Sequence, residues 1–260
     1  MWTLGLLAGV VGCDGAGEVA PRSAALTEPE SRWSPAEPWM RAAEVVARRG
    51  ALVLVRRDAE AAPPGTDVRP AVPMAVLRDD GAALPPPAPV VEGALLDGSV
   101  AWVDVDGVLL LDDGAQLRAV ADDVHGELAV HPDGRLLAYA MRPGEQGGVS
   151  LAAVDGGEPR RVTCGLAVAD RPLFADDGAL VVVGARAGGV AGVWVVDHAA
   201  NAASEPQPRP ITNAALRAGA PLGAGFVPPP AYHGSMRIED GALVYDDGER
   251  EQRVALEVDQ

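Results

Sequence analysis

The sequence contains no lysine. Its 21 basic residues are all arginine, they stand against 37 acidic residues, and the formal net charge is −16 at pH 7. A protein that binds nucleic acid through the phosphates needs clustered positive charge, so this composition argues against nucleic acid as a partner. Aromatic residues are also scarce, at 4% of a chain that is 48% hydrophobic. Valine, leucine and alanine must therefore fill the core.

Cysteine is limited to Cys13 and Cys164. Cys164 ends an apolar run without an evident histidine and asparagine partner, so we interpret it as a small buried hydrophobic residue. A disulfide between the two cysteines is the alternative, provided that the N-terminal segment is retained.

The first thirteen residues, MWTLGLLAGVVGC, form a short apolar run. A membrane-spanning helix needs about 20 apolar residues, whereas this run has the length of the apolar part of a secretory signal. Val10-Val11-Gly12-Cys13 resembles the bacterial lipobox, which implies lipidation of Cys13, although no basic residue precedes the run. The alternative is an ordinary buried or frayed N-terminal segment.

The sequence divides into a signal segment at 1–13, a flexible tether at 14–33 and a folded domain at 34–260. The tether is rich in alanine, glutamate, proline and serine and has no periodicity. The sequence Ser34-Pro35-Ala36-Glu37 has the form of a capping box, and it predicts one short helix near 36–48.

From residue 51 onward, short apolar runs alternate with glycine, proline and aspartate, as is typical of β-strands and turns. Residues 127–163 contain four such runs, the size of one propeller blade. The Asp-Gly pairs of the recurring turns precede a strand in three successive units: Asp97-Gly98, Asp133-Gly134 and Asp177-Gly178. Apolar runs that end in aspartate follow at intervals of about 42 residues, which indicates a repeat.

Motifs for catalysis or metal binding are missing. The sequence has no G-x-S-x-G, no phosphate-binding loop and no dinucleotide fingerprint. Its four histidines are scattered singly, so no zinc site is predicted. The acidic pairs around Asp104 and Asp112 are separated by an apolar run, and they fit hairpin turns better than a calcium loop. We therefore predict no catalytic residue, no metal and no cofactor.

The segment HPDGRLLAYA, followed by VSLAAVDGGEPRRVT, resembles the WD40-like propeller repeat of TolB and related periplasmic proteins. Val130-His131-Pro132-Asp133-Gly134 matches the turn of that repeat, and Arg161-Val162-Thr163 matches its end. The resemblance is strong in 127–163, fair in 94–120 and 171–212, and weak elsewhere. It implies that the turn residues, including Pro132, Asp133 and Gly134, are structural.

We therefore predict an all-β protein, a β-propeller of four-stranded antiparallel blades. About five blades are expected, with degenerate terminal units; an open arrangement or a β-sandwich is the alternative. The expected function is that of a non-catalytic lipoprotein, anchored through Cys13 and facing the periplasm or cell surface, that binds or scaffolds a partner protein. The alternatives are an enzyme that acts on carbohydrates or peptides with carboxylates in the central channel, and a structural remnant.

Overall fold

The computed structural model describes residues 31–58, 70–142, 148–163, 166–186, 192–196, 209–210, 237–240, 242–246 and 251–255. Within these ranges the chain forms five antiparallel sheets and one short helix. Cys13, Cys164 and most of the predicted tether lie outside the described residues. No helix in the described ranges is long and apolar enough to cross a membrane.

The five sheets are called blades 1 to 5 in chain order. Blade 1 comprises β1 (Ser34–Pro35), β2 (Glu44–Arg49), β3 (Leu52–Arg56), β4 (Met74–Arg78) and β5 (Ala82–Leu84). Blade 2 comprises β6 (Val90–Leu95), β7 (Val100–Asp104), β8 (Leu109–Asp112) and β9 (Leu117–Ala121). Blade 3 comprises β10 (Val124–Val130), β11 (Leu136–Met141), β12 (Gly148–Ala153) and β13 (Arg160–Arg161). Blade 4 comprises β14 (Val168–Phe174), β15 (Leu180–Ala185), β16 (Gly192–Val196) and β17 (Arg209–Pro210), and blade 5 comprises β18 (Arg237–Glu239), β19 (Ala242–Asp246) and β20 (Glu251–Ala255).

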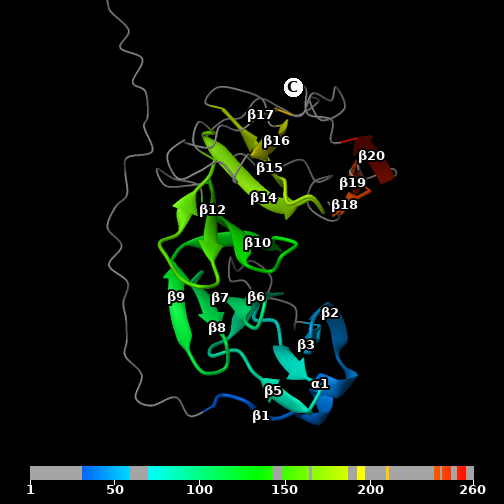
Figure 1. Cartoon of the computed structure of the whole chain (residues 1–260), viewed down its shortest axis with the longest axis vertical. Helices are drawn as coiled ribbons and strands as arrows, with labels where there is room; N and C mark the ends of the chain where they lie inside the picture. Colours follow the sequence, from blue (N-terminus) through cyan, green and yellow to red (C-terminus); the bar gives the residue numbers. More distant parts are fainter. Residues whose placement is uncertain are drawn as a thin grey trace, which may run out of the picture.

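In blades 2 to 5 the strands pair in chain order. In blade 1, β2 to β5 also pair in chain order, and β1 joins the sheet beside β5, so each blade is built on an antiparallel meander. In Figure 1 the blades follow one another around a common centre, and β2 of blade 1 and the first strand of each later blade lie nearest to it. Blade 1 and blade 5 stand at the two ends of this arc. The protein is thus a β-propeller, which confirms the predicted all-β class with about five small blades.

Successive side chains of a strand point to opposite faces of its sheet. The apolar side chains on facing sides of neighbouring blades therefore meet and form the core. Between blades 1 and 2, Trp102 packs with Leu54, Met74 and Val76. The largest fully buried aromatic side chains of the described residues are Trp102, between blades 1 and 2, and Tyr139, between blades 2 and 3. Aliphatic residues fill the rest, as the low aromatic content predicts.

The predicted helix near 36–48 is wrong in its extent. The helix α1 covers only Pro38–Ala42, and Ala43 already has extended backbone angles. Residues 44–49 instead form β2, which pairs with β3 from Glu44 to Arg49. β-Branched Val45 and Val46 favour a strand, and the backbone hydrogen bonds with β3 outweigh the helical spacing of the apolar residues.

The predicted capping box at 34–37 is replaced by other contacts. Ser34 and Pro35 form β1, which pairs with Ala83 and Ala82 at the outer edge of blade 1. The residue before the helix is Glu37, and its carboxylate accepts a hydrogen bond from Trp39 Nε1 at 2.9 Å. The helix therefore begins without a side-chain cap on its own backbone.

Tyr139 provides a pH test of the core between blades 2 and 3. Burial raises the pKa of its hydroxyl to about 12, although a hydrogen bond with Ser150 opposes this increase. Between pH 10 and 12 the folded protein therefore keeps a proton that the unfolded chain loses. The contribution of this group to the free energy of unfolding is fully present below pH 10, and about 2 kcal/mol of it is lost as the pH rises to 12.

We expect Tyr139→Phe to remove this alkaline loss. The measurement is the free energy of unfolding in urea at several values between pH 9 and pH 12. Because the chain has no lysine, few other side chains titrate in this window, and the variant itself serves as the baseline for the remaining two tyrosines. If the free energy of unfolding fell equally with pH in both proteins, the result would contradict the burial of this hydroxyl.

Candidate functional site

Five strands form what we call the inner rim: β2 of blade 1 and the first strands of the other four blades, β6, β10, β14 and β18. Each is an edge strand of its sheet: among the described strands it pairs with one neighbour only, the strand that follows it in the chain. Figure 1 shows all five facing the common centre. An edge strand presents backbone N–H and C=O groups that its own sheet does not pair. Some of these bind loops of the chain: the Val90 carbonyl accepts from Val72 N–H, and Val124 N–H donates to the Gly107 carbonyl. The rest of the rim offers hydrogen-bonding groups to whatever occupies the centre.

Pairing irregularities interrupt the inner-rim strands of blades 1 to 4. The register shifts between Val45 and Ala47 in β2 and between Val90 and Glu92 in β6. Corresponding shifts occur in β10 and in β14. β-Bulges redirect side chains and are frequent next to functional sites. Their recurrence on the same strand of four blades makes the inner rim the candidate site.

Polar side chains lie at these bulges. Glu92 on β6, His125 on β10 and both Asp170 and Arg171 on β14 are half-buried. The Asp170 carboxylate accepts a hydrogen bond from the backbone N–H of Arg171 at 2.7 Å. Carboxylates, an imidazole and a guanidinium thus share the rim with free strand edges. This combination suits hydrogen bonding and ion pairing with a polar ligand.

Two of the three non-glycine residues with positive φ in the described ranges lie at or next to the bulged strands β10 and β14, and the third, Asp240, lies in the turn after β18. Arg171 has φ of 51° and Asp123, directly before β10, has φ of 57°. A non-glycine residue in this left-handed region costs about 1–3 kcal/mol, and such residues cluster at functional sites. The strained positions therefore support the assignment of the site to the bulges of β10 and β14.

The turn residues singled out in the sequence lie away from the bulges, between the first and second strands of their blades. Gly98, Gly134 and Gly178 have φ of 73°, 77° and 86°, which only glycine adopts readily. Asp133 Oδ1 accepts a hydrogen bond from the backbone N–H of Arg135 at 2.8 Å. This bond, followed by the interaction with His131, lowers the pKa of Asp133.

These turns also join neighbouring blades. The Asp97 N–H donates to the Gly134 carbonyl at 2.9 Å, which connects blade 2 to blade 3. His131 packs against Gly178 and stacks edge-on with Phe174 of blade 4, with ring centroids 5.1 Å apart. Pro132 accepts a hydrogen bond from Arg49 Nη1 of blade 1 through its carbonyl, at 3.2 Å. The turns therefore hold blades together.

The aspartates weighed as calcium ligands also have structural partners. Asp104 Oδ1 accepts hydrogen bonds from the N–H groups of Asp106 and Val108, at 2.9 and 2.8 Å. Asp112 is buried and forms an ion pair with Arg32. In the described part of the chain, no three His, Cys, Asp or Glu side chains gather as a metal site would require.

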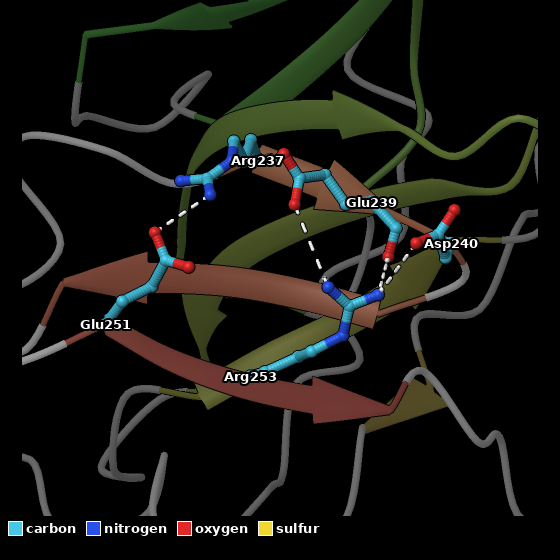
Figure 2. Close-up of polar contacts among 5 residues, drawn as sticks. All are labelled: Arg237, Glu239, Asp240, Glu251 and Arg253. Atoms are coloured by element: carbon cyan, nitrogen blue, oxygen red, sulfur yellow. Dashed lines mark hydrogen bonds and ion pairs between the residues drawn. The ribbon is translucent and has the colours of Figure 1, made fainter.

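Blade 5 carries a charged network on one face, shown in Figure 2. Arg237 binds Glu239 and Glu251 at 2.7 and 2.8 Å, and Arg253 binds Asp240 at 3.2 Å. Val244 on the middle strand β19 pairs with Arg237 on one side and with Arg253 on the other, and it is fully buried. The carboxylates raise the pKa of Arg237. Two arginines thus pair with three carboxylates over a buried valine, which leaves this face with one negative charge in excess.

Sequence reasoning did not find the inner rim. Glu92, His125 and Arg171 belong to no motif, and their bulges depend on how two strands pair. It also missed a concentration of basic residues in blade 1, although the signal was present: residues 41–57 contain five arginines and one acidic residue, Glu44.

No protein-family model matches the chain, and no curated protein matches it. Solved structures do resemble it. A putative TolB from Agrobacterium tumefaciens shows 15% identity and a TM-score of 0.44 over 70% of this chain. A gluconolactonase from Xanthomonas campestris shows 16% identity and a TM-score of 0.38 over 68% of the chain, and TolB from Acinetobacter baumannii shows 12% and 0.29 over 78%. The matches span 68%, 65% and 63% of those three proteins, respectively.

Proposed function

We propose that the protein is a non-catalytic propeller that binds or scaffolds a partner protein at its inner rim. The observation that supports this most directly is the set of bulged edge strands that carry Glu92, His125 and Arg171 around one centre. Free strand edges and half-buried charged groups are spread over several blades. An extended protein segment can use such a surface by combining main-chain hydrogen bonds with side-chain contacts.

Export and anchoring belong to the same proposal. The lipobox-like sequence that ends at Cys13 supports lipidation. Because Arg32 and Trp33 bind to the blades, the tether would comprise residues 14–31, about 18 residues, long enough to hold the propeller clear of a membrane surface. The protein would face the periplasm or the cell surface. Metabolic labelling with a fatty acid tests this part: Cys13→Ala should abolish the label, and unchanged labelling would contradict the anchor.

The partner is tested by photo-crosslinking in cells that produce the protein. A photoreactive residue at His125 of the inner rim should yield a specific adduct with one protein, identified by mass spectrometry. The matched control is Ala119, an exposed residue on β9, the outermost strand of blade 2. Rim-specific adducts are expected because the centre of the propeller is the binding surface. Identical adducts from both positions, or none from the rim, would contradict the proposal.

An enzyme that acts on carbohydrates or peptides is the second candidate. It is favoured by the half-buried carboxylates Glu92 and Asp170 on inner-rim strands of two blades, since hydrolysis of a glycosidic bond uses a pair of carboxylates. The double variant Glu92→Gln with Asp170→Asn separates the two functions. Turnover of a glycoside or peptide panel by the original protein, lost in this variant, would establish the enzyme instead.

A further inference from the structure

Among the described residues, the outward flank of blade 1, turned away from blade 2, is only partly covered. Leu54, Val76 and Leu84 face blade 2. Their neighbours in sequence, Val55, Ala75 and Ala83, point to the opposite face and pack with Met40 of α1. The helix therefore covers the outer part of the flank, over β3, β4 and β5.

The inner part of the same flank lies on β2. Val45 is opposite Val55 in register and Arg48 is opposite Val53, so both side chains share the face that α1 covers farther out. Val45 is 45% exposed, and Val46 at the bulge is 41% exposed. These are the large hydrophobic side chains that the described part of the chain leaves exposed. Edge strands are commonly protected by charged residues at such positions. Two exposed valines on an edge that no described strand pairs with therefore indicate a binding surface.

The surroundings of these valines are basic in a protein of strongly negative charge. Arg41, Arg48, Arg56 and Arg57 are exposed, and Arg49 is half-buried. With Glu44 as the single acidic residue, residues 41–57 carry a net charge of +4 (five minus one). Glu44 is paired with Arg56 at 3.1 Å, and Arg57 lies over the Trp39 ring at 5.5 Å. Arg48 lies on β2 itself and Arg41 is four residues before Val45 in the sequence, so both add positive charge near the apolar edge.

We infer that the edge of β2 binds an extended, acidic segment of the partner protein, which adds to blade 1 as a strand. This inference rests on the proposed function and specifies the chemistry of its partner. The bound segment forms main-chain hydrogen bonds with β2. On the outward face, one of its apolar side chains contacts Val45 and an acidic side chain pairs with Arg48. Cross-strand pairs of this kind add about 0.2–1 kcal/mol each.

The charge pattern favours this occupant over the alternatives. A second copy of the chain would bring two basic hairpins and two net charges of −16 together, and both contacts are repulsive. An anionic lipid surface would attract the arginines but would leave the strand edge without hydrogen-bond partners. An acidic, extended peptide satisfies the charge, the apolar side chains and the backbone together.

The test is fluorescence anisotropy of the full chain with synthetic peptides of about eight residues, long enough to run along β2. One peptide alternates threonine with valine and glutamate; a second has lysine in place of glutamate; a third carries N-methyl groups on alternate backbone amides. We expect saturable binding of the first peptide alone. Arg41→Glu with Arg48→Glu should weaken this binding at least roughly tenfold, because it reverses two charges beside the edge.

The matched control is Arg135→Glu, a charge reversal at an exposed turn residue of blade 3, which should leave binding within about twofold. Circular dichroism of each variant serves to check that it is folded. The double variant Val45→Thr with Val46→Thr changes no charge and should also bind more weakly. The inference is overturned if the N-methylated peptide or the lysine peptide binds as well as the first peptide, or if the first peptide does not bind. Concentration-dependent dimerisation of the protein in light scattering would also overturn it. If rim-specific crosslinking persists in any of these cases, the proposed function stands and only this assignment of the partner fails.

Discussion

Replacement of Trp102 by alanine is expected to lower the free energy of unfolding by about 3–5 kcal/mol, the range for removal of a large buried aromatic side chain. Trp102 is fully buried at the interface of blades 1 and 2 and packs with Leu54, Met74 and Val76. The site cannot collapse easily, because the indole contacts residues from two separate sheets. The lost contacts and the remaining cavity therefore add.

The space for this indole depends on Gly93, its partner across β6 and β7. A Cβ atom at Gly93 would lie 2.9 Å from the Trp102 ring. The indole Nε1 has no hydrogen-bond acceptor among the described residues, so the site selects for an aromatic ring and not for its N–H group. Trp102→Phe should accordingly cost less than half as much as Trp102→Ala.

Urea unfolding followed by circular dichroism provides the measurement for both Trp102 variants. A decrease in the transition midpoint with an unchanged slope indicates lost stability of the same folded state. Equal losses for phenylalanine and alanine would contradict the packing argument, because they would assign the effect to the indole N–H.

Arg32→Ala is expected to lower the free energy of unfolding by about 3 kcal/mol, the lower end of the range for breaking a buried ion pair. Arg32 forms an ion pair with Asp112, and its second amino group donates to the Pro85 carbonyl at 2.9 Å. The Asp112 side chain is 0% exposed whereas that of Arg32 is 25% exposed. Loss of the guanidinium leaves a buried carboxylate with one remaining hydrogen bond, from Gly114 N–H at 3.0 Å.

A double variant identifies the cause. Asp112→Asn keeps an acceptor for Gly114 but removes the buried charge, so Arg32→Ala together with Asp112→Asn should cost less than Arg32→Ala alone. The control is Arg56→Ala, which breaks the exposed pair with Glu44 and should cost at most about 1 kcal/mol. A loss in Arg32→Ala no larger than in this control would contradict the buried ion pair.

The same contacts fasten the segment that enters blade 1. Arg32 N–H donates to the Gly114 carbonyl at 3.0 Å, Trp33 packs on Gly114, and Arg78 lies over the Trp33 ring at 4.5 Å. The sequence placed Arg32 and Trp33 at the end of the tether. In the folded protein they connect blade 1 to the turn between β8 and β9 of blade 2.

Local turn chemistry made the blades predictable. Asp133-Gly134 and Asp177-Gly178 occupy turns with positive φ at glycine, and the apolar runs on either side of them pair as neighbouring strands. These features depend on a few consecutive residues, so they can be read from the chain. The helix failed because its apolar spacing was also compatible with β2, and pairing with β3 decided the outcome.

By itself, the sequence determined the all-β class, the repeat and the turns, because each depends on neighbours a few residues apart. Only the tertiary structure decided which charged groups come together. Asp112 meets a partner 80 residues away, the bulges place Glu92, His125 and Arg171 on one rim, and Val45 stays exposed because α1 stops short of β2. Such outcomes depend on the packing of whole sheets and on burial, which no local pattern of residues contains.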